Sequence, residues 1–337
     1  MRTFIIAEAG ANHNRDWNLA RKLVEVAAES GADAVKFQTY TSEDLYSANT
    51  PDFAGYESIP DLIRSIQMPR SWHRDLKTLC DDLGIEFMST PFDERAVDEL
   101  VDVGVKRLKV ASFEAKDRRL LRKIARTRLP VIFSAGVGTS SKDVGDIIEF
   151  LHDEGSSADI TVLHCNSAYP TPFEDICLGQ IGVLLRDHSA VAKIGFSDHT
   201  TGILAPPIAV SLGASVVEKH FTLDRTMKGP DHPFAIEPNE LRDMVQNIRL
   251  AEIMLKEKTG MTDSESDRKM WSALRSVVTS RPISAGSLIV SDDITTKRPM
   301  LKGSISAEDY YKLSSGAFRA KRDLPADHIL MREDVEK

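Results

Sequence analysis

The segment FIIAEAGANHNRDWNLARKLVEVAAESGADAVKFQT, residues 4–39, decides the fold class of this chain. It begins with a short apolar run at 4–9 and ends with another at 34–39, and apolar residues recur at helical spacing over 17–30 between them. Short strands that are apolar on both faces and separated by a helix are typical of parallel strands buried on both sides. The segment therefore predicts a strand, a helix and a second strand parallel to the first.

The same alternation of strand and helix continues to about residue 258. Further strands are predicted at 86–90, 107–111, 131–135, 160–165, 193–197 and 216–222. Further helices are predicted at 69–83, 94–103, 117–126, 141–154, 176–188, 202–212 and 238–258. Eight strand–helix units in a segment of this size predict a (β/α)₈ TIM barrel, which usually takes about 250 residues. A doubly wound open sheet is the alternative, but the first strand ends in EAGANHN, which lacks the GxGxxG typical of that fold.

The chain changes character after the predicted barrel. We expect a catalytic barrel at 1–260, a polar, helix-breaking linker at 261–275 and a small β-rich domain at 276–337. Within the last domain, residues 283–294 resemble residues 324–335, because each copy has an apolar residue, a tight turn, three apolar residues and an acidic turn. Two copies predict a small pseudo-symmetric module, since a solenoid needs at least about three repeats.

Composition limits the classes of function. The 337 residues carry a net charge of −8, which argues against nucleic-acid binding and against a membrane-surface role. No apolar run approaches the ~20 residues of a membrane span, and the N-terminal sequence lacks the apolar core of a signal peptide. Three unpaired cysteines indicate a reducing compartment, so a cytoplasmic protein is expected, with Cys80 and Cys177 in the core. His73, His152, His188 and His328 are expected to face solvent.

Polar side chains fall at the end of every predicted barrel strand. The candidates are Glu8, Lys36, Thr90, Lys109, Ser112, Ser134, Ser167, Ser197, His199 and His220. Each residue taken alone has an ordinary structural explanation, such as a lysine that extends to solvent or a serine in a turn. In a (β/α)₈ barrel, however, all strand ends meet at one mouth, where active sites are built. We therefore expect these residues to form one site.

These residue types predict a particular chemistry. Lysines supply point charge to a small polyanion such as a phosphate, and hydroxyl and backbone N–H groups complete its shell. Two imidazoles, His199 and His220, suit a divalent metal with open positions, and manganese, cobalt, iron or magnesium fits better than a closed structural zinc. A phosphate site beside an open metal suits a phosphorylated three-carbon donor that attacks a polarised carbonyl.

At these residues the sequence resembles the sialic acid synthases, which comprise N-acetylneuraminate synthase and its legionaminate and pseudaminate relatives. The matching segments are AEAGANHN (7–14), AVKFQT (34–39), STPFD (89–93), LKVAS (108–112), SAG (134–136), HCNSAYPTP (164–172), GFSDHT (195–200), EKHFTLD (218–224), GPDH (229–232) and KRP (297–299). They span nearly the whole chain in the order of the family. The tail is similar to the SAF (antifreeze-like) domain that these synthases carry after their barrel.

The resemblance implies roles for individual residues. Phosphoenolpyruvate would be bound by Lys36, Thr90, Lys109, Ser112, Ser134 and Ser197, with Ser167 where the family often has asparagine. His199 and His220 would be the metal ligands, for Mn²⁺ in the first place, with Mg²⁺ or Co²⁺ as alternatives. Glu8, Tyr169 and Asp231 would contact the sugar acceptor or the reacting centre. Arg298 would reach the acceptor in the partner subunit of a domain-swapped homodimer.

Two further departures from the family pattern concern the backbone. Arg15 stands where an HNG motif would have glycine, and Asp327 replaces the turn glycine of the second tail copy.

The activity implied by the resemblance is a condensation of phosphoenolpyruvate with an open-chain N-acetyl amino sugar and water. Carbon 3 of the donor would attack the aldehyde, water would add at carbon 2 with Glu8 handling a proton, and phosphate would leave. N-acetylmannosamine is the favoured acceptor, and a 2,4-diacetamido sugar is the alternative. A 3-deoxy-sugar-acid synthase acting on a phosphorylated sugar, and a catalytically inactive carbohydrate-binding protein, are the competing hypotheses.

Overall fold

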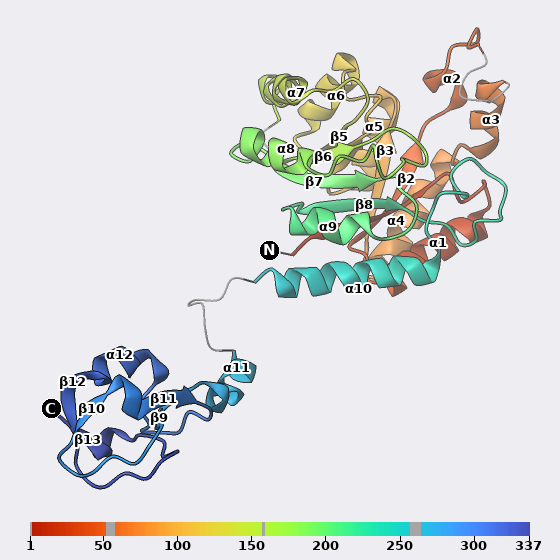
Figure 1. Cartoon of the computed structure of the whole chain (residues 1–337). Helices are drawn as coiled ribbons and strands as arrows, with labels where there is room; N and C mark the ends of the chain where they lie inside the picture. Colours follow the sequence, from red (N-terminus) through yellow and green to blue (C-terminus); the bar gives the residue numbers. More distant parts are fainter. Residues whose placement is uncertain (1, 52–57, 157–158, 257–263) are drawn as a thin grey trace. The chain divides into compact units, whose positions relative to one another are not determined.

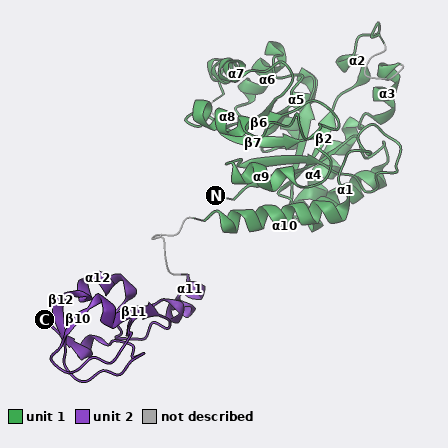
Figure 2. Cartoon of the chain, viewed as in Figure 1, with its two compact units in different colours: residues 1–256 green, residues 257–337 purple. Residues whose placement is uncertain are grey.

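The computed structural model describes residues 2–51, 58–156, 159–256 and 264–337. The chain divides into two compact units, residues 1–256 and 257–337, each with a hydrophobic core of its own (Figure 2). Within the described residues, no helix is both long enough and apolar enough to span a membrane.

The first unit is an eight-stranded parallel barrel. Its strands are β1 (Phe4–Gly10), β2 (Ala34–Thr39), β3 (Glu86–Pro91), β4 (Leu108–Val110), β5 (Val131–Ala135), β6 (Ile160–Cys165), β7 (Lys193–Asp198) and β8 (Val216–His220). They pair in the order β3-β2-β1-β8-β7-β6-β5-β4. The outermost two strands of this order, β3 and β4, lie against each other, and this contact closes the sheet. The predicted (β/α)₈ barrel is therefore confirmed, and the open-sheet alternative is wrong.

Helices surround the barrel (Figure 1). They are α1 (Trp17–Glu29), α2 (Ser42–Leu45), α3 (Ile59–Ile66), η1 (Arg70–Trp72), α4 (His73–Asp82), α5 (Glu94–Val103), α6 (Arg118–Thr127), α7 (Ser141–Asp153), α8 (Gln180–His188), α9 (Ala205–Ser211) and α10 (Pro238–Met254). Side-chain caps define many of their starts; Asp16, for example, accepts hydrogen bonds from two backbone N–H groups of α1. The sequence pattern did not predict α2 and α3, which lie in the long connection after β2.

The barrel interior has an apolar floor and a polar upper layer. The floor is a cluster of six buried side chains from different strands: Ile6, Ala34, Met88, Ile132, Leu163 and Val216. Side chains two positions further along a strand point to the same face. The next inward positions on these strands are Glu8, Lys36, Thr90, Ser134, Cys165 and Glu218, all buried. Five of these six strands thus change from an apolar to a polar inward residue toward their carboxyl ends; the exception is β6, with Cys165.

Two minor expectations are wrong. Cys177 is exposed, because it precedes α8 in a turn with a positive φ of 45°, whereas Cys80 is in the core as expected. His73 is only 2% exposed. It opens α4 and its Nε2 lies 2.9 Å from Thr39 Oγ1, so that it packs against the barrel instead of facing solvent.

The second unit is β-rich. Its elements are α11 (Glu265–Lys269), η2 (Trp271–Ala273), β9 (Ser276–Thr279), β10 (Leu288–Val290), η3 (Ser291–Asp293), β11 (Ile294–Lys297), η4 (Ala307–Asp309), α12 (Tyr310–Leu313), β12 (Ser315–Ala320), η5 (Arg332–Asp334) and β13 (Val335–Glu336). Of the predicted linker, residues 261–263 lie outside the described residues, and the remainder contains the short helices α11 and η2.

The internal repeat lies at the centre of this unit. Ile283 and Leu324, the first residues of the two copies, exchange two backbone hydrogen bonds of 2.9 and 2.8 Å. The acidic turns are equivalent as well: Asp293 accepts a hydrogen bond from Arg281 at 2.7 Å, and the buried Asp334 accepts one from Arg322 at 2.8 Å. The predicted pseudo-symmetric module is thereby confirmed.

Candidate active site

The structure brings most of the predicted site residues to one cavity at the carboxyl ends of the barrel strands. Ten of them line it: Glu8, Lys36, Thr90, Lys109, Ser112, Ser134, Tyr169, Ser197, His199 and His220. Ser167 joins the same cluster, because its Oγ lies 2.9 Å from Ser112 Oγ. The cavity is small, with a volume of about 40 Å³.

Two buried lysines lie between two buried carboxylates at the base of this cavity. Lys36 Nζ is 2.7 Å from Glu8 Oε2 and 3.7 Å from Glu218 Oε2. Lys109 Nζ is 3.8 Å from Glu218 Oε1 and donates a hydrogen bond of 2.8 Å to Ser134. With Glu8 ionised, the two lysines and the two carboxylates carry no net charge, so the buried charges are paired within the protein.

Burial shifts the protonation of this cluster. Burial raises the pKa of Glu8 to about 7. The attraction of Lys36 opposes this rise, and the repulsion of Glu218 adds to it. Burial also lowers the pKa of Lys109. For Lys36, the Glu218 and Glu8 carboxylates outweigh burial and raise the pKa. Glu8 is thus the group whose surroundings suit it to exchange a proton near neutral pH.

A close approach of the backbone shapes one side of the cavity. A Cβ atom on Gly136 would lie 2.6 Å from Ser167 Oγ and 2.7 Å from Ser112 Cβ. The N–H of Val137, the next residue, donates a hydrogen bond of 3.3 Å to Ser167 Oγ. Glycine is required at this position because no side chain fits beneath the two serines. The result is a compact group of hydroxyl and amide donors of the kind that surrounds a phosphate.

The two histidines form an adjacent pair. The ring centroids of His199 and His220 are 5.4 Å apart. His199 Nδ1 lies 2.5 Å from the carbonyl oxygen of Asn166, so the Nδ1–H donates there and Nε2 keeps its lone pair. Burial lowers the pKa of His199 to about 4, and burial together with His199 lowers that of His220 well below its usual value. Both imidazoles are therefore neutral at pH 7, the form that binds metals.

The donor set fits an open divalent metal site. Among the described residues, the buried His220 Nδ1 has no hydrogen-bond partner, and the carboxylate nearest to it is that of Asp231 at 3.8 Å. A buried polar nitrogen without a partner is costly, and a bound cation would relieve that cost. The described part of the chain contains no cluster of three or more histidine, cysteine or acidic residues arranged around a metal. Two imidazoles would thus leave the remaining positions to water or substrate, unlike a closed structural site.

A wider, more apolar cavity of about 290 Å³ adjoins the small one, and the two share five lining residues: Gln38, Phe92, Ala111, Tyr169 and His220. Its apolar wall comes from α2, α3 and the loop after β4, and consists of Leu45, Ile59, Leu62, Ile63 and Phe113. Asp231 also lines it, and burial raises the pKa of this carboxyl to about 6. Tyr169 stands between the two cavities with its ring centroid 4.2 Å from that of His199.

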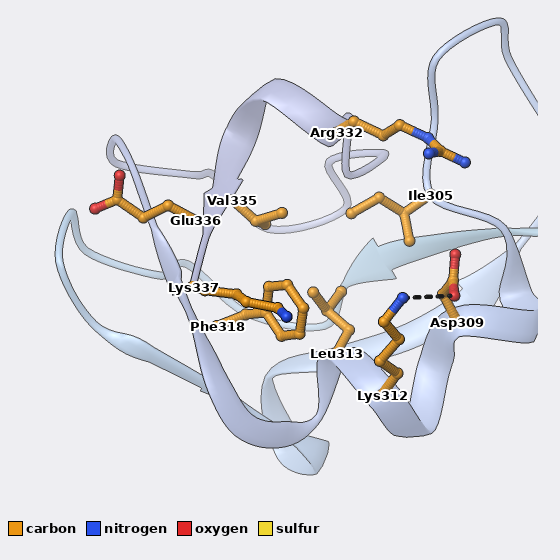
Figure 3. Close-up of a pocket in the computed structure, with 9 residues that line it drawn as sticks. All are labelled: Ile305, Asp309, Lys312, Leu313, Phe318, Arg332, Val335, Glu336 and Lys337. Atoms are coloured by element: carbon orange, nitrogen blue, oxygen red, sulfur yellow. Dashed lines mark ion pairs between the residues drawn. The ribbon is translucent and has the colours of Figure 1, made fainter.

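Arg298 belongs to the second unit, where it is exposed directly after β11. Its role at the sugar acceptor stays a prediction. The second unit has a cavity of its own, about 280 Å³, with Ile305, Leu313 and Phe318 among its lining residues (Figure 3). None of its lining residues is a histidine, serine or cysteine. Despite its size, this cavity lacks the groups that the predicted chemistry requires.

Sequence reasoning missed two residues of the site. Glu218 accepts a hydrogen bond of 2.9 Å from Ser197 and contacts both lysines, and Gln38 donates one of 3.0 Å to Glu8. The alternation of a strand provides the signal that finds them. Glu218 precedes His220 by two residues and Gln38 follows Lys36 by two, so each shares an inward face with a predicted site residue.

The two departures from glycine lie in left-handed backbone. Arg15 has a φ of 55° and Asp327 a φ of 62°, so both keep the conformation that a glycine would adopt more easily. The Arg15 side chain compensates by donating a hydrogen bond of 3.0 Å to the carbonyl of Arg64 in α3. Asp327 compensates by an ion pair of 2.5 Å with Lys297. These departures therefore change side-chain contacts and preserve the turns.

Comparisons with known proteins agree with the two-unit division. The model of the NeuB family matches residues 23–260, and the model of the SAF domain matches residues 275–336. The chain is 39% identical over 329 residues to the N,N'-diacetyllegionaminic acid synthase of Legionella pneumophila, covering 94% of this chain and 86% of the relative. It is 34% identical over 340 residues to the pseudaminic acid synthase of Helicobacter pylori, covering 99% and 98%.

A solved structure is similar as well. The crystal structure of N-acetylneuraminic acid (sialic acid) synthetase from Leptospira borgpetersenii, in complex with citrate, superimposes with a TM-score of 0.72 at 33% identity. The match covers 81% of this chain and 92% of that one.

Proposed function

We propose that this chain, which belongs to the NeuB family, condenses phosphoenolpyruvate with the open-chain aldehyde of an N-acetyl amino sugar at the mouth of its barrel. The products are a nonulosonic acid and inorganic phosphate. The observation that carries the proposal is the meeting of two buried lysines, several hydroxyls and two neutral imidazoles in one cavity. A carbohydrate-binding protein without catalysis would have no use for such a costly arrangement of buried charge.

We propose that the donor binds at the lysines. Lys36 and Lys109 would neutralise its anionic groups, and the hydroxyls of Thr90, Ser134 and Ser197 would complete the shell together with Ser112 and Ser167. The phosphate would compete with Glu8 and Glu218 for the lysines, so donor binding would loosen the ion pairs of Lys36 and Lys109 with these carboxylates.

The proposed reaction needs one water molecule and one group that accepts a proton. Carbon 3 of phosphoenolpyruvate forms a bond to the aldehyde carbon, and the aldehyde oxygen takes up a proton to become a hydroxyl. Water adds at carbon 2 and gives up one proton. The bond from carbon 2 to the phosphate oxygen then breaks, and loss of the second proton of that water leaves a ketone at carbon 2. We propose that Glu8 accepts the proton of that water, because its pKa is raised to about 7 and its partner Gln38 orients it. Lys36 and Lys109 stabilise the charge on the departing phosphate.

We further propose that His199 and His220 hold a divalent metal, Mn²⁺ in the first place, with Mg²⁺ or Co²⁺ as alternatives. When bound there, the metal supplies Lewis acidity that polarises the carbonyl of the acceptor. The carbonyl of Asn166 fixes the ring of His199 for this purpose, and the ring of Tyr169 covers the pair on the side of the wider cavity.

The wider cavity is the proposed acceptor site, and its lining favours one class of acceptor. N-acetylmannosamine carries hydroxyl groups along most of its length, which would face Leu45, Ile63 and Phe113 without partners. A 6-deoxy 2,4-diacetamido sugar offers three methyl groups instead, and burial of a methylene-sized group is worth about 0.8 kcal/mol. The apolar wall therefore shifts the preference from N-acetylmannosamine to the 2,4-diacetamido alternative.

The proposed working unit is a homodimer. Two neighbouring helices carry exposed apolar stripes: Leu204, Ile208 and Leu212 at α9, and Leu250, Ile253 and Met254 on α10. Exposed apolar surface of this kind marks an interface, and a second copy of the chain is the partner proposed for it. In such a dimer the tail of one subunit would bring Arg298 to the acceptor in the other.

The test is a mass-spectrometric assay with phosphoenolpyruvate, Mn²⁺ and three acceptors: N-acetylmannosamine, its 6-phosphate and a 6-deoxy 2,4-diacetamido hexose. We expect a nonulosonic acid and stoichiometric phosphate, most rapidly with the diacetamido sugar, and loss of turnover after chelation. Turnover with the phosphorylated sugar alone would favour a 3-deoxy-sugar-acid type of synthase. No phosphate release with any acceptor would contradict the proposal.

A further inference from the structure

A buried ion pair lies behind the two histidines, on the outer face of the barrel wall. Lys219 Nζ is 2.8 Å from Asp198 Oδ2, and the two side chains are 1% and 0% exposed. Asp198 ends β7, Lys219 lies in β8, and the two residues are directly opposite each other in the ladder. The outward positions one step earlier are Phe196 and Val217, which belong to the apolar core. The pair thus interrupts an apolar layer at the level of the two histidines.

The pair fixes the backbone on both sides of His199. Asp198 Oδ1 accepts hydrogen bonds from the backbone N–H of Thr200 at 2.9 Å and from its hydroxyl at 2.8 Å. Lys219 Nζ also donates to the carbonyl of Thr200 at 2.5 Å. His199 therefore lies between two residues, Asp198 and Thr200, that are hydrogen-bonded to each other and to Lys219. Lys219 directly precedes His220 in the chain.

Stability alone does not account for the pair. A buried ion pair gains little over an apolar pair of similar volume, because both charges lose their hydration. The contribution of this pair is geometric, because one ammonium group links the turn that carries His199 to the strand residue that precedes His220. The separation and orientation of the two imidazoles follow from that link.

We propose that Asp198 and Lys219 are positioning residues that set the spacing of His199 and His220 and thereby the affinity of the pair for a divalent cation. This inference rests on the proposed function, in which the histidines hold the metal. Neither residue touches substrate or metal, since both side chains lie on the outer face. Groups that orient metal ligands from behind typically change metal affinity by about 10- to 100-fold when they are removed.

The test measures Mn²⁺ binding by the full-length chain, from the electron paramagnetic resonance signal of the free ion. The variant is Asp198→Asn combined with Lys219→Met, which removes both charges together and leaves no unpaired buried ion. We expect a circular dichroism spectrum like that of the wild type and a Kd for Mn²⁺ at least tenfold higher. A folded double variant with an unchanged Kd would overturn the inference.

A matched control is the pair Arg107–Glu86, whose atoms lie 2.7 Å apart at the amino ends of β3 and β4. The variant Arg107→Met with Glu86→Gln should leave Mn²⁺ affinity within about threefold of the wild type. A loss of Mn²⁺ affinity equal to that of the Asp198/Lys219 double variant would also overturn the inference. If the Asp198/Lys219 double variant does not fold, Thr200→Val removes one hydrogen bond of the same network and should raise the Kd about threefold; an unchanged Kd counts against the inference.

A wild type that binds no Mn²⁺ would overturn both this inference and the proposed metal site, whereas binding by the wild type and the double variant alike would overturn only the inference.

Discussion

Lys36 Nζ lies 2.7 Å from Glu8 Oε2 at the base of the barrel mouth, and both side chains are almost fully buried. The carboxylate occupies the place that an anionic substrate would take beside the ammonium group. Glu8 thus holds Lys36 in position and keeps the cavity electrically balanced before the donor arrives. In the proposed reaction, phosphate would take over the lysine and release the carboxylate for proton transfer.

Glu8→Gln tests this role. The amide keeps the shape of the side chain and its contact with Gln38, but it cannot accept a proton. We expect kcat to fall by about 100-fold or more, the usual contribution of a positioned acid or base. The KM for phosphoenolpyruvate should stay level or decrease, because one competitor for Lys36 is lost. Steady-state phosphate release measures both constants.

The control for this variant is Glu114→Gln. Burial raises the pKa of Glu114 to about 7 as well, but Glu114 does not line the small cavity. Its kcat should remain within about threefold of the wild type. A fall of less than threefold for Glu8→Gln itself would remove Glu8 from the mechanism.

Gly136→Ala should damage donor binding through crowding. The added Cβ would lie 2.6 Å from Ser167 Oγ, so Ser112 and Ser167 must shift. Overpacking of this kind costs about 1–3 kcal/mol. We expect at least a tenfold weaker affinity for phosphoenolpyruvate, measured by isothermal titration calorimetry, and a lower melting temperature.

Gly182→Ala is the comparison for that variant. Gly182 lies in α8, and a Cβ there would meet no atom within 4 Å. Since alanine is favoured over glycine within a helix by about 0.5–1 kcal/mol, this change should stabilise the protein slightly and leave donor affinity unchanged. Equal affinity for phosphoenolpyruvate in both variants would refute the account of Gly136.

His73 should make the barrel sensitive to mild acid. Burial lowers its pKa to about 4 from an ordinary 6.5, so between these values the unfolded chain binds a proton that the folded chain does not. The free energy of unfolding is therefore unaffected by this group above pH 6.5 and falls as the pH drops toward 4. By pH 5 the loss from this residue is about 2 kcal/mol.

His73→Gln removes the titrating group and retains a partner for Thr39. Urea unfolding followed by circular dichroism should show that the free energy of unfolding of this variant falls between pH 7.5 and pH 5 by about 2 kcal/mol less than that of the wild type. Identical slopes for wild type and His73→Gln would show that His73 does not stay neutral in the folded state.

Arg298→Ala tests the proposed role of the tail. If the exposed guanidinium reaches the acceptor in a partner subunit, its loss should raise the KM of the sugar about tenfold or more and change that of phosphoenolpyruvate by less than twofold. Initial rates with each substrate varied in turn provide the two values. An equal rise in both would mean that Arg298 acts on something other than the acceptor.

Ile253→Asp tests the proposed dimer surface. Ile253 is 60% exposed on α10, and a carboxylate there cannot be buried against a second copy without a large cost. Sedimentation velocity should show a dimer for the wild type and a dissociation constant at least tenfold higher for the variant. Leu83→Asp, at an apolar residue 44% exposed after α4, should leave the dimer intact. A monomeric wild type would exclude the surface as an interface.

Periodicity predicted the barrel because its strands are short and buried on both faces. The predicted and observed bounds agree at β2, β5 and β6. The connection after β2 was different, because α2 and α3 are short and depend on contacts with each other. Ser42 in α2, for example, bonds the side chain of Gln67 and the carbonyl of Pro60, neither of which a local pattern indicates.

The candidate site was predictable in part for the same reason. Residues such as Lys36 and His220 stand out as polar groups at strand ends, and the fold then brings them together. Glu218 did not stand out, because an acidic residue in an apolar strand has meaning only once its inward face is known. The Asp198–Lys219 pair was equally hidden, since the register of β7 against β8 places the two residues opposite each other.

The six apolar side chains at the bottom of the barrel seal it at one end. The cavity above them is therefore closed at its base. If the donor binds at the lysines and the sugar in the wider cavity, as proposed, the donor would have to enter before the sugar, and phosphate would leave after the larger product.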